Sequence, residues 1–88
     1  MTTTDKANAR ALLLKLPEEQ LRIIARGGAT GVCLDGRWIY YYCGQTITRH
    51  VNMLVKRRVL DITYFVGGKS GANLTDFGRV VQEQIPHL

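Results

Sequence analysis

Apolar residues recur at helical spacing near the N-terminus. Residues 6–16 are rich in strong helix formers. Four apolar residues of this stretch lie at positions i, i+3, i+4 and i+7, namely Ala9, Leu12, Leu13 and Leu16. The pattern predicts an amphipathic helix over 6–16 with Asp5 as its N-cap, after a disordered tail of residues 1–5. Pro17 ends this helix and begins a second one, which closes at Gly27-Gly28.

The pattern then changes to one typical of strands. Asp35-Gly36 is a strong two-residue hairpin signal, and β-forming residues flank it on both sides. A turn at these two residues places Leu34 opposite Arg37 and Cys33 opposite Trp38. This register argues against a disulfide between Cys33 and Cys43 within one chain.

Helical spacing returns after Thr46. Four apolar residues lie at i, i+4, i+7 and i+8, namely Ile47, Val51, Leu54 and Val55. Polar and basic residues occupy the opposite side: Arg49, Asn52, Lys56 and Arg57. The pattern predicts a basic amphipathic helix over 46–59 with Thr46 as its N-cap.

The last third of the chain predicts a hairpin and a helix. Ile62, Tyr64 and Val66 alternate as in a strand, residues 67–71 form a glycine-rich tip, and a short strand returns, so the hairpin spans 61–75. Thr75 caps a final helix that ends before Pro86. We therefore expect one α+β domain over residues 1–88.

The charge is concentrated in one part of the chain. The 88 residues carry a net charge of +5, and five Lys and Arg against one acid in residues 49–69 account for four of these charges. A basic excess favours polyanions, nucleic acid first. No apolar run is long enough to cross a membrane, and the N-terminus has no secretory pattern, which indicates a cytoplasmic protein.

The residue types that carry catalysis or hold metals form no recognisable pattern. The spacing of the two cysteines and two histidines matches no zinc site. The glycine-rich segment GGKSG lacks the first glycine of a phosphate-binding loop, since Thr63 stands in its place. Most acids fall at predicted caps and turns. We expect no enzyme activity, no metal and no cofactor.

The order of elements from Pro17 onward resembles the winged helix-turn-helix domain, specifically the MarR-like group of bacterial transcription regulators. TITRHVNMLVKRRVL, residues 46–60, is similar to that family's recognition helix and its exit into the wing, and LTDFG, residues 74–78, is similar to the start of the helix after the wing. The chain departs from the pattern at Arg58, where glycine is usual. It also has GRWIYYYCG, residues 36–44, where a short helix is usual, so this segment is either a helix against its propensity or a strand that replaces it.

The resemblance and the charge predict sequence-specific binding to double-stranded DNA. Helix 46–59 would enter the major groove and the 67–71 tip would lie on the backbone. The expected contact residues are Thr46, Thr48, Arg49, Asn52, Lys56, Arg57, Arg58 and Lys69. The alternative is a protein-interaction module without DNA binding, such as a phage- or mobile-element-type inhibitor or adaptor.

A homodimer is also expected, because the leucine-rich helix 6–16 exceeds what such a domain needs. The residues predicted to lie at interfaces with a second copy or another protein are Leu12, Leu13, Leu16, Trp38 and Tyr41.

Overall fold

The computed structural model describes residues 3–87, which form helices and strands in the following order. The first half contains α1 (Thr3–Leu13), α2 (Glu18–Arg26), β1 (Gly28–Leu34), β2 (Arg37–Tyr42) and β3 (Gln45–Thr46). The second half contains α3 (Thr48–Lys56), β4 (Leu60–Phe65), β5 (Lys69–Leu74), α4 (Asp76–Gln84) and the 3-10 turn η1 (Ile85–His87).

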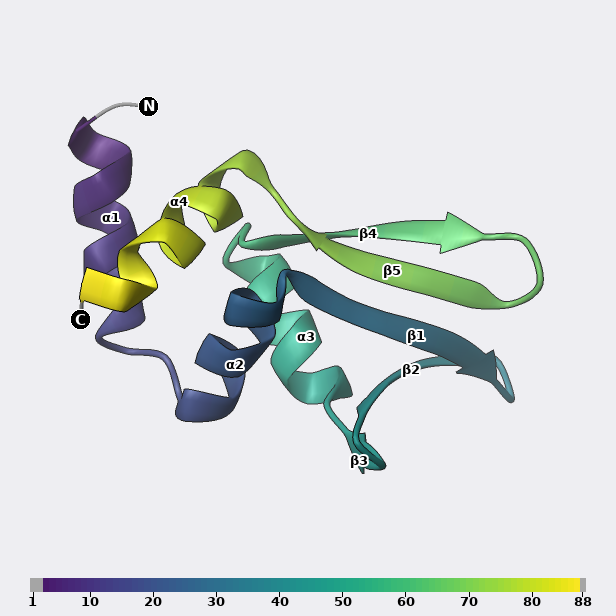
Figure 1. Cartoon of the computed structure of the whole chain (residues 1–88). Helices are drawn as coiled ribbons and strands as arrows, with labels where there is room; N and C mark the ends of the chain where they lie inside the picture. The colour runs from purple at the N-terminus through teal and green to yellow at the C-terminus, as the bar shows by residue number, and fades with distance from the viewer. Residues whose placement is uncertain (1–2, 88) are drawn as a thin grey trace.

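The strands form a single antiparallel sheet in the order β3-β2-β1-β5-β4. The helices gather at one end of this sheet, and the two long hairpins β1–β2 and β4–β5 extend away from them (Figure 1). The expected α+β class is confirmed. The sheet is larger than expected, because β1 pairs with β5 as well as with β2 and so joins the two hairpins.

The first hairpin has the register that its turn predicts. Leu34 lies opposite Arg37 and Cys33 opposite Trp38. Asp35 and Gly36 have φ angles of 51° and 76°, and positive φ at both central residues is the mark of the type I′ turn. Cys33 and Cys43 are both free and exposed.

The N-terminal helix begins and ends earlier than expected. It spans Thr3–Leu13 instead of 6–16, so residues 3–5 are helical, and the prediction of a disordered tail is wrong for them. Residues 1–2 of that tail lie outside the described residues. Asp5 lies within the first turn, where its charge favours the helix N-terminus, instead of capping it. The early end follows from Pro17, which disfavours helical backbone at Leu16.

The basic helix is also shorter than expected, spanning Thr48–Lys56 instead of 46–59. Thr46 is not the N-cap of this helix, because Thr46 belongs to the short strand β3 and pairs there with Tyr41 of β2. At the other end Arg58 has a φ of 62°, the left-handed backbone that a residue at a usual glycine position must adopt. This turn sends Val59 and Leu60 into the core.

Residues 37–42 form a strand, which settles the open question about GRWIYYYCG. Aromatic and β-branched side chains favour this state, and β2 pairs along one side of β1. The second hairpin turns at residues 66–68 instead of 67–71, so Lys69 is the first residue of β5 and not part of the tip. Thr75 caps α4 as expected, since its Oγ1 accepts a hydrogen bond from the Gly78 backbone N–H at 2.9 Å.

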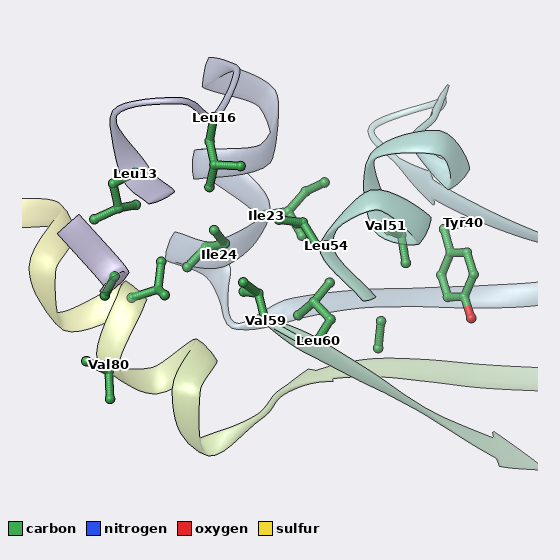
Figure 2. Packing of buried hydrophobic residues seen from close by; sticks show 13 residues of the cluster. Leu13, Leu16, Ile23, Ile24, Tyr40, Val51, Leu54, Val59, Leu60 and Val80 are labelled. Carbon is green, nitrogen blue, oxygen red and sulfur yellow. The ribbon is translucent and has the colours of Figure 1, made fainter. Parts of the chain in front are cut away.

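The core lies between the helices and the near half of the sheet (Figure 2). Its fully buried side chains come from every helix and from three strands, with Ile23, Ile24, Tyr40, Val51, Leu54, Val59, Leu60 and Val81 the largest. Tyr40 lies beside Val51 at the end of the cluster nearest the hairpins (Figure 2), and its hydroxyl accepts a hydrogen bond from Ser70 Oγ at 3.0 Å. Gly31 makes room for this ring, since a Cβ there would lie 2.7 Å from it.

Tyr40→Phe is expected to destabilise the fold by about 1–2 kcal/mol, because it leaves the buried Ser70 hydroxyl without its acceptor. Urea unfolding measures the change. Tyr42→Phe is the matched control, because the Tyr42 side chain is exposed, and it should change stability by less than about 0.5 kcal/mol. Adding Ser70→Ala to Tyr40→Phe should recover part of the loss. Equal effects of the two tyrosine substitutions would contradict the role of this hydrogen bond.

Candidate nucleic-acid interface

One face of α3 is exposed along its length. Arg49, Asn52, Met53 and Lys56 lie at i, i+3, i+4 and i+7, and all four side chains are exposed. We call these four residues the α3 stripe. The opposite side of the helix carries the buried Val51 and Leu54, and α3 packs against α2, β2 and β4. The helix contains no acidic residue, so the stripe offers hydrogen-bond donors, two cations and one apolar side chain.

Two other residues of α3 face the protein itself. The half-buried Thr48 accepts a hydrogen bond at its Oγ1 from the Tyr40 backbone N–H, at 2.9 Å. His50 Nδ1 lies 3.2 Å from Gln20 Nε2, and His50 Nε2 contacts the Glu19 carboxylate. Thr48 therefore ties α3 to β2 through this hydrogen bond, and its predicted contact with DNA stays a prediction. Thr46 lies in β3, outside the helix, and remains exposed.

The basic residues after α3 differ from one another. Arg57 is half-buried, and its Nε is a buried atom with no hydrogen-bond partner among the described residues. Arg58 is exposed, and its carbonyl accepts a hydrogen bond from Thr75 Oγ1. Of this pair, Arg58 is the more exposed residue.

Lys69 is exposed at the far end of the second hairpin. The turn between β4 and β5 points away from the helices (Figure 1), and Val66 within it is 98% exposed. The structure therefore presents the α3 stripe and the hairpin end as two separate basic features instead of one continuous cluster.

The predicted interface residues mostly serve the chain's own core. Leu13 and Leu16 are buried, and Leu12 packs against the core, because α1 lies against α4. In this conformation Leu13 and Leu16 are not available to a second copy, which removes the basis for expecting helix 6–16 to dimerise the protein. The one highly exposed leucine of this region is Leu14, which follows α1.

The two aromatic residues of the predicted interface have different surroundings. Trp38 is half-buried, and its ring centroid lies 4.9 Å from that of Tyr64. Tyr41 is 41% exposed and stays available to a partner. Reasoning from the sequence missed Arg26, whose guanidinium carbon lies 3.3 Å from the centre of the Tyr42 ring. No local pattern signals that contact, because α2 and β2 are brought together only by the fold.

Over residues 3–87, no group of three or more histidine, cysteine, aspartate or glutamate side chains could hold a metal ion. None of the helices in that range has both the length and the apolar character needed to cross a membrane. Searches with protein-family models, among curated proteins and among solved structures found no match to this chain. What the chain can bind must therefore be inferred from its own side chains.

Proposed function

We propose that this protein binds double-stranded DNA through α3, as a small transcription regulator on a winged-helix-like scaffold. The observation that carries the proposal is the α3 stripe, which joins an arginine, an asparagine and a lysine on one exposed helix face free of acids. These residue types are the ones that read and hold DNA. Arginine pairs with guanine through two hydrogen bonds, asparagine pairs with adenine in the same way, and lysine holds phosphate.

The dimensions of α3 suit the major groove. An α-helix with its side chains is about 10–12 Å across, which fits the major groove width of about 12 Å, and the nine residues of α3 give it about two and a half turns. Arg49 and Asn52 lie in the N-terminal half, which is the part of a recognition helix that contacts bases. Lys56 ends the helix and Arg58 follows it, so both suit the phosphates that flank the groove.

The arrangement of the other elements also favours DNA binding, with one difference from the usual winged helix. In the usual winged helix a short helix precedes the recognition helix, and here the strands β2 and β3 hold that place. The strands still fix α3, through the hydrogen bond between Thr48 and Tyr40 and through a second bond from the Ile47 backbone N–H to the Tyr40 carbonyl at 2.7 Å. The β4–β5 hairpin takes the place of the wing, with Lys69 as its basic residue. The alternative function, a protein-interaction module, stays a prediction supported by the exposure of Tyr41.

An unbiased selection from random duplexes tests the proposal. We expect the enriched duplexes to share a sequence, and binding to weaken steeply as salt rises, since phosphate contacts release counterions. The protein carrying Asn52→Ala should enrich a sequence with relaxed preference at the position that the amide reads. A selection that enriches no sequence at low salt would overturn the proposal.

A further inference from the structure

The two faces of the sheet differ in how their aromatic side chains meet. On the face that carries Tyr40, the rings of Trp38 from β2 and Tyr64 from β4 lean together and touch, with centroids 4.9 Å apart. Tyr41 and Phe65 follow next along the same two strands and therefore point to the opposite face. Both are exposed, 41% and 56%, and they border a hollow instead of closing it.

The register explains why this hollow exists. Thr30 of β1 lies opposite Gly71 of β5, and Gly71 lies opposite Thr63 of β4, so only small side chains cover the middle of the sheet here. The Phe65 ring leans over Gly71, where an added Cβ would lie 3.3 Å from it. The glycine therefore leaves a shallow floor between two aromatic walls.

Two hollows of about 470 and 450 Å³ lie between the two aromatic walls, and Gly71 lines the larger of them. Thr30, Tyr41 and Phe65 line both of them, so they form one continuous trough, which we call the aromatic trough. One end reaches Arg26 and Asn73, and the other reaches Lys69. The volumes lie in the range of small-molecule and nucleotide sites.

The charged residues that line the aromatic trough are all basic. Arg26 and Lys69 line its two ends, and no aspartate or glutamate lines either hollow. Three other hollows on the described surface each include at least one acid: Glu19 in the first, Asp61 and Asp76 in the second, and Asp5, Asp76 and Glu83 in the third. The contact of Arg26 with the Tyr42 ring holds its guanidinium beside the trough.

We propose that the aromatic trough binds single-stranded nucleic acid. Unpaired bases would stack on Tyr41 and Phe65, and the phosphates would lie against Arg26 and Lys69. Exposed aromatic rings with cations along the same groove are the combination that single strands require, because every base has a face to stack. A duplex keeps its bases stacked on each other and offers none to the rings. This site is separate from the α3 stripe, since α3 packs on β2 and β4 through the side of the molecule that holds the core.

Fluorescence anisotropy with a labelled oligothymidylate of about twelve nucleotides tests the proposal. Tyr41→Leu and Phe65→Leu keep apolar side chains but remove the rings, and each is expected to weaken binding about tenfold. Tyr64→Leu is the matched control, because Tyr64 precedes Phe65 on the same strand, is 60% exposed and points to the other face. It should change the affinity by less than about twofold.

The outcomes separate this proposal from duplex binding by α3. The variant Arg49→Ala, Lys56→Ala should bind the oligothymidylate as the parent does, whether or not the parent binds duplexes. The proposal is overturned if the parent does not bind the oligothymidylate at low salt. It is also overturned if Tyr64→Leu weakens binding as much as Phe65→Leu does, or if the variant Arg49→Ala, Lys56→Ala no longer binds the oligothymidylate. It is also overturned if sedimentation shows a dimer that Phe65→Leu dissociates, since the trough is then an interface between copies.

Discussion

Replacing Arg49 and Lys56 together with alanine is expected to weaken duplex binding about a hundredfold. Both side chains are exposed on one face of α3. A bidentate contact from Arg49 to guanine would contribute about 1–3 kcal/mol, and a phosphate contact from Lys56 would add to it. Loss of the Lys56 contact can be recognised separately. Each lost phosphate contact lowers the slope of log affinity against log salt concentration by about one unit.

A charge-matched control separates these contacts from general attraction. Arg10→Ala with Arg79→Ala removes the same charge from exposed positions on α1 and α4, away from the α3 stripe. The affinity of this control for the duplex should fall by less than about threefold at moderate salt, since salt screens the attraction of distant charges. Anisotropy titrations of a selected duplex at several salt concentrations measure both variants. Equal losses in the two would show that net charge, and not α3, determines binding.

The sequence predicts best where one short segment decides the outcome. The pair Asp35-Gly36 determined the register of the first hairpin, because two residues with positive φ allow one tight turn. Thr75 was predicted to cap α4, and its hydroxyl does so. The apolar stripe of α3 was also correct, with Val51 and Leu54 buried and Arg49 and Lys56 exposed.

The sequence predicts less well where two local solutions compete. Thr46 suits both a helix cap and a strand, and pairing with Tyr41 decides for the strand. The periodicity of helix 6–16 identified its apolar face but not what covers that face. The structure covers it with α4, so Leu13 and Leu16 serve the chain's own core and not a dimer.

The aromatic trough lies beyond the reach of pattern reasoning altogether. Its walls and ends come from four elements, with Arg26 on α2, Tyr41 on β2, Phe65 on β4 and Lys69 on β5. The run of aromatic residues from Trp38 to Tyr42 predicts a strand, but stacking on single strands requires cations beside the rings. No cation stands within that run. The fold supplies Arg26 and Lys69 through the pairing of β1 with both β2 and β5.

Gly78→Ala gives a test in which helix propensity and packing predict opposite signs. Gly78 lies in the first turn of α4, and replacing a helical glycine with alanine ordinarily stabilises a protein by about 1 kcal/mol. Here a Cβ would lie 2.1 Å from the Val59 carbonyl oxygen and 3.1 Å from its carbonyl carbon. Both are backbone atoms, so no side-chain rotation relieves the overlap.

The Val59 carbonyl cannot move freely, because it already accepts a hydrogen bond from the Thr75 backbone N–H at 3.0 Å. Moving it would also displace the link between α3 and β4. We therefore expect Gly78→Ala to destabilise the fold by about 3 kcal/mol.

Urea unfolding measures this loss, with Arg79→Ala as the control at the next, exposed position, where the change should stay within about 0.5 kcal/mol. A Gly78→Ala protein at least as stable as the parent would show that α4 does not approach Val59 this closely. The position of α3 depends on the same approach, because Val59 joins the end of α3 to β4. A weaker effect at Gly78 would therefore also indicate that the fold holds α3 less rigidly than base recognition by the α3 stripe requires.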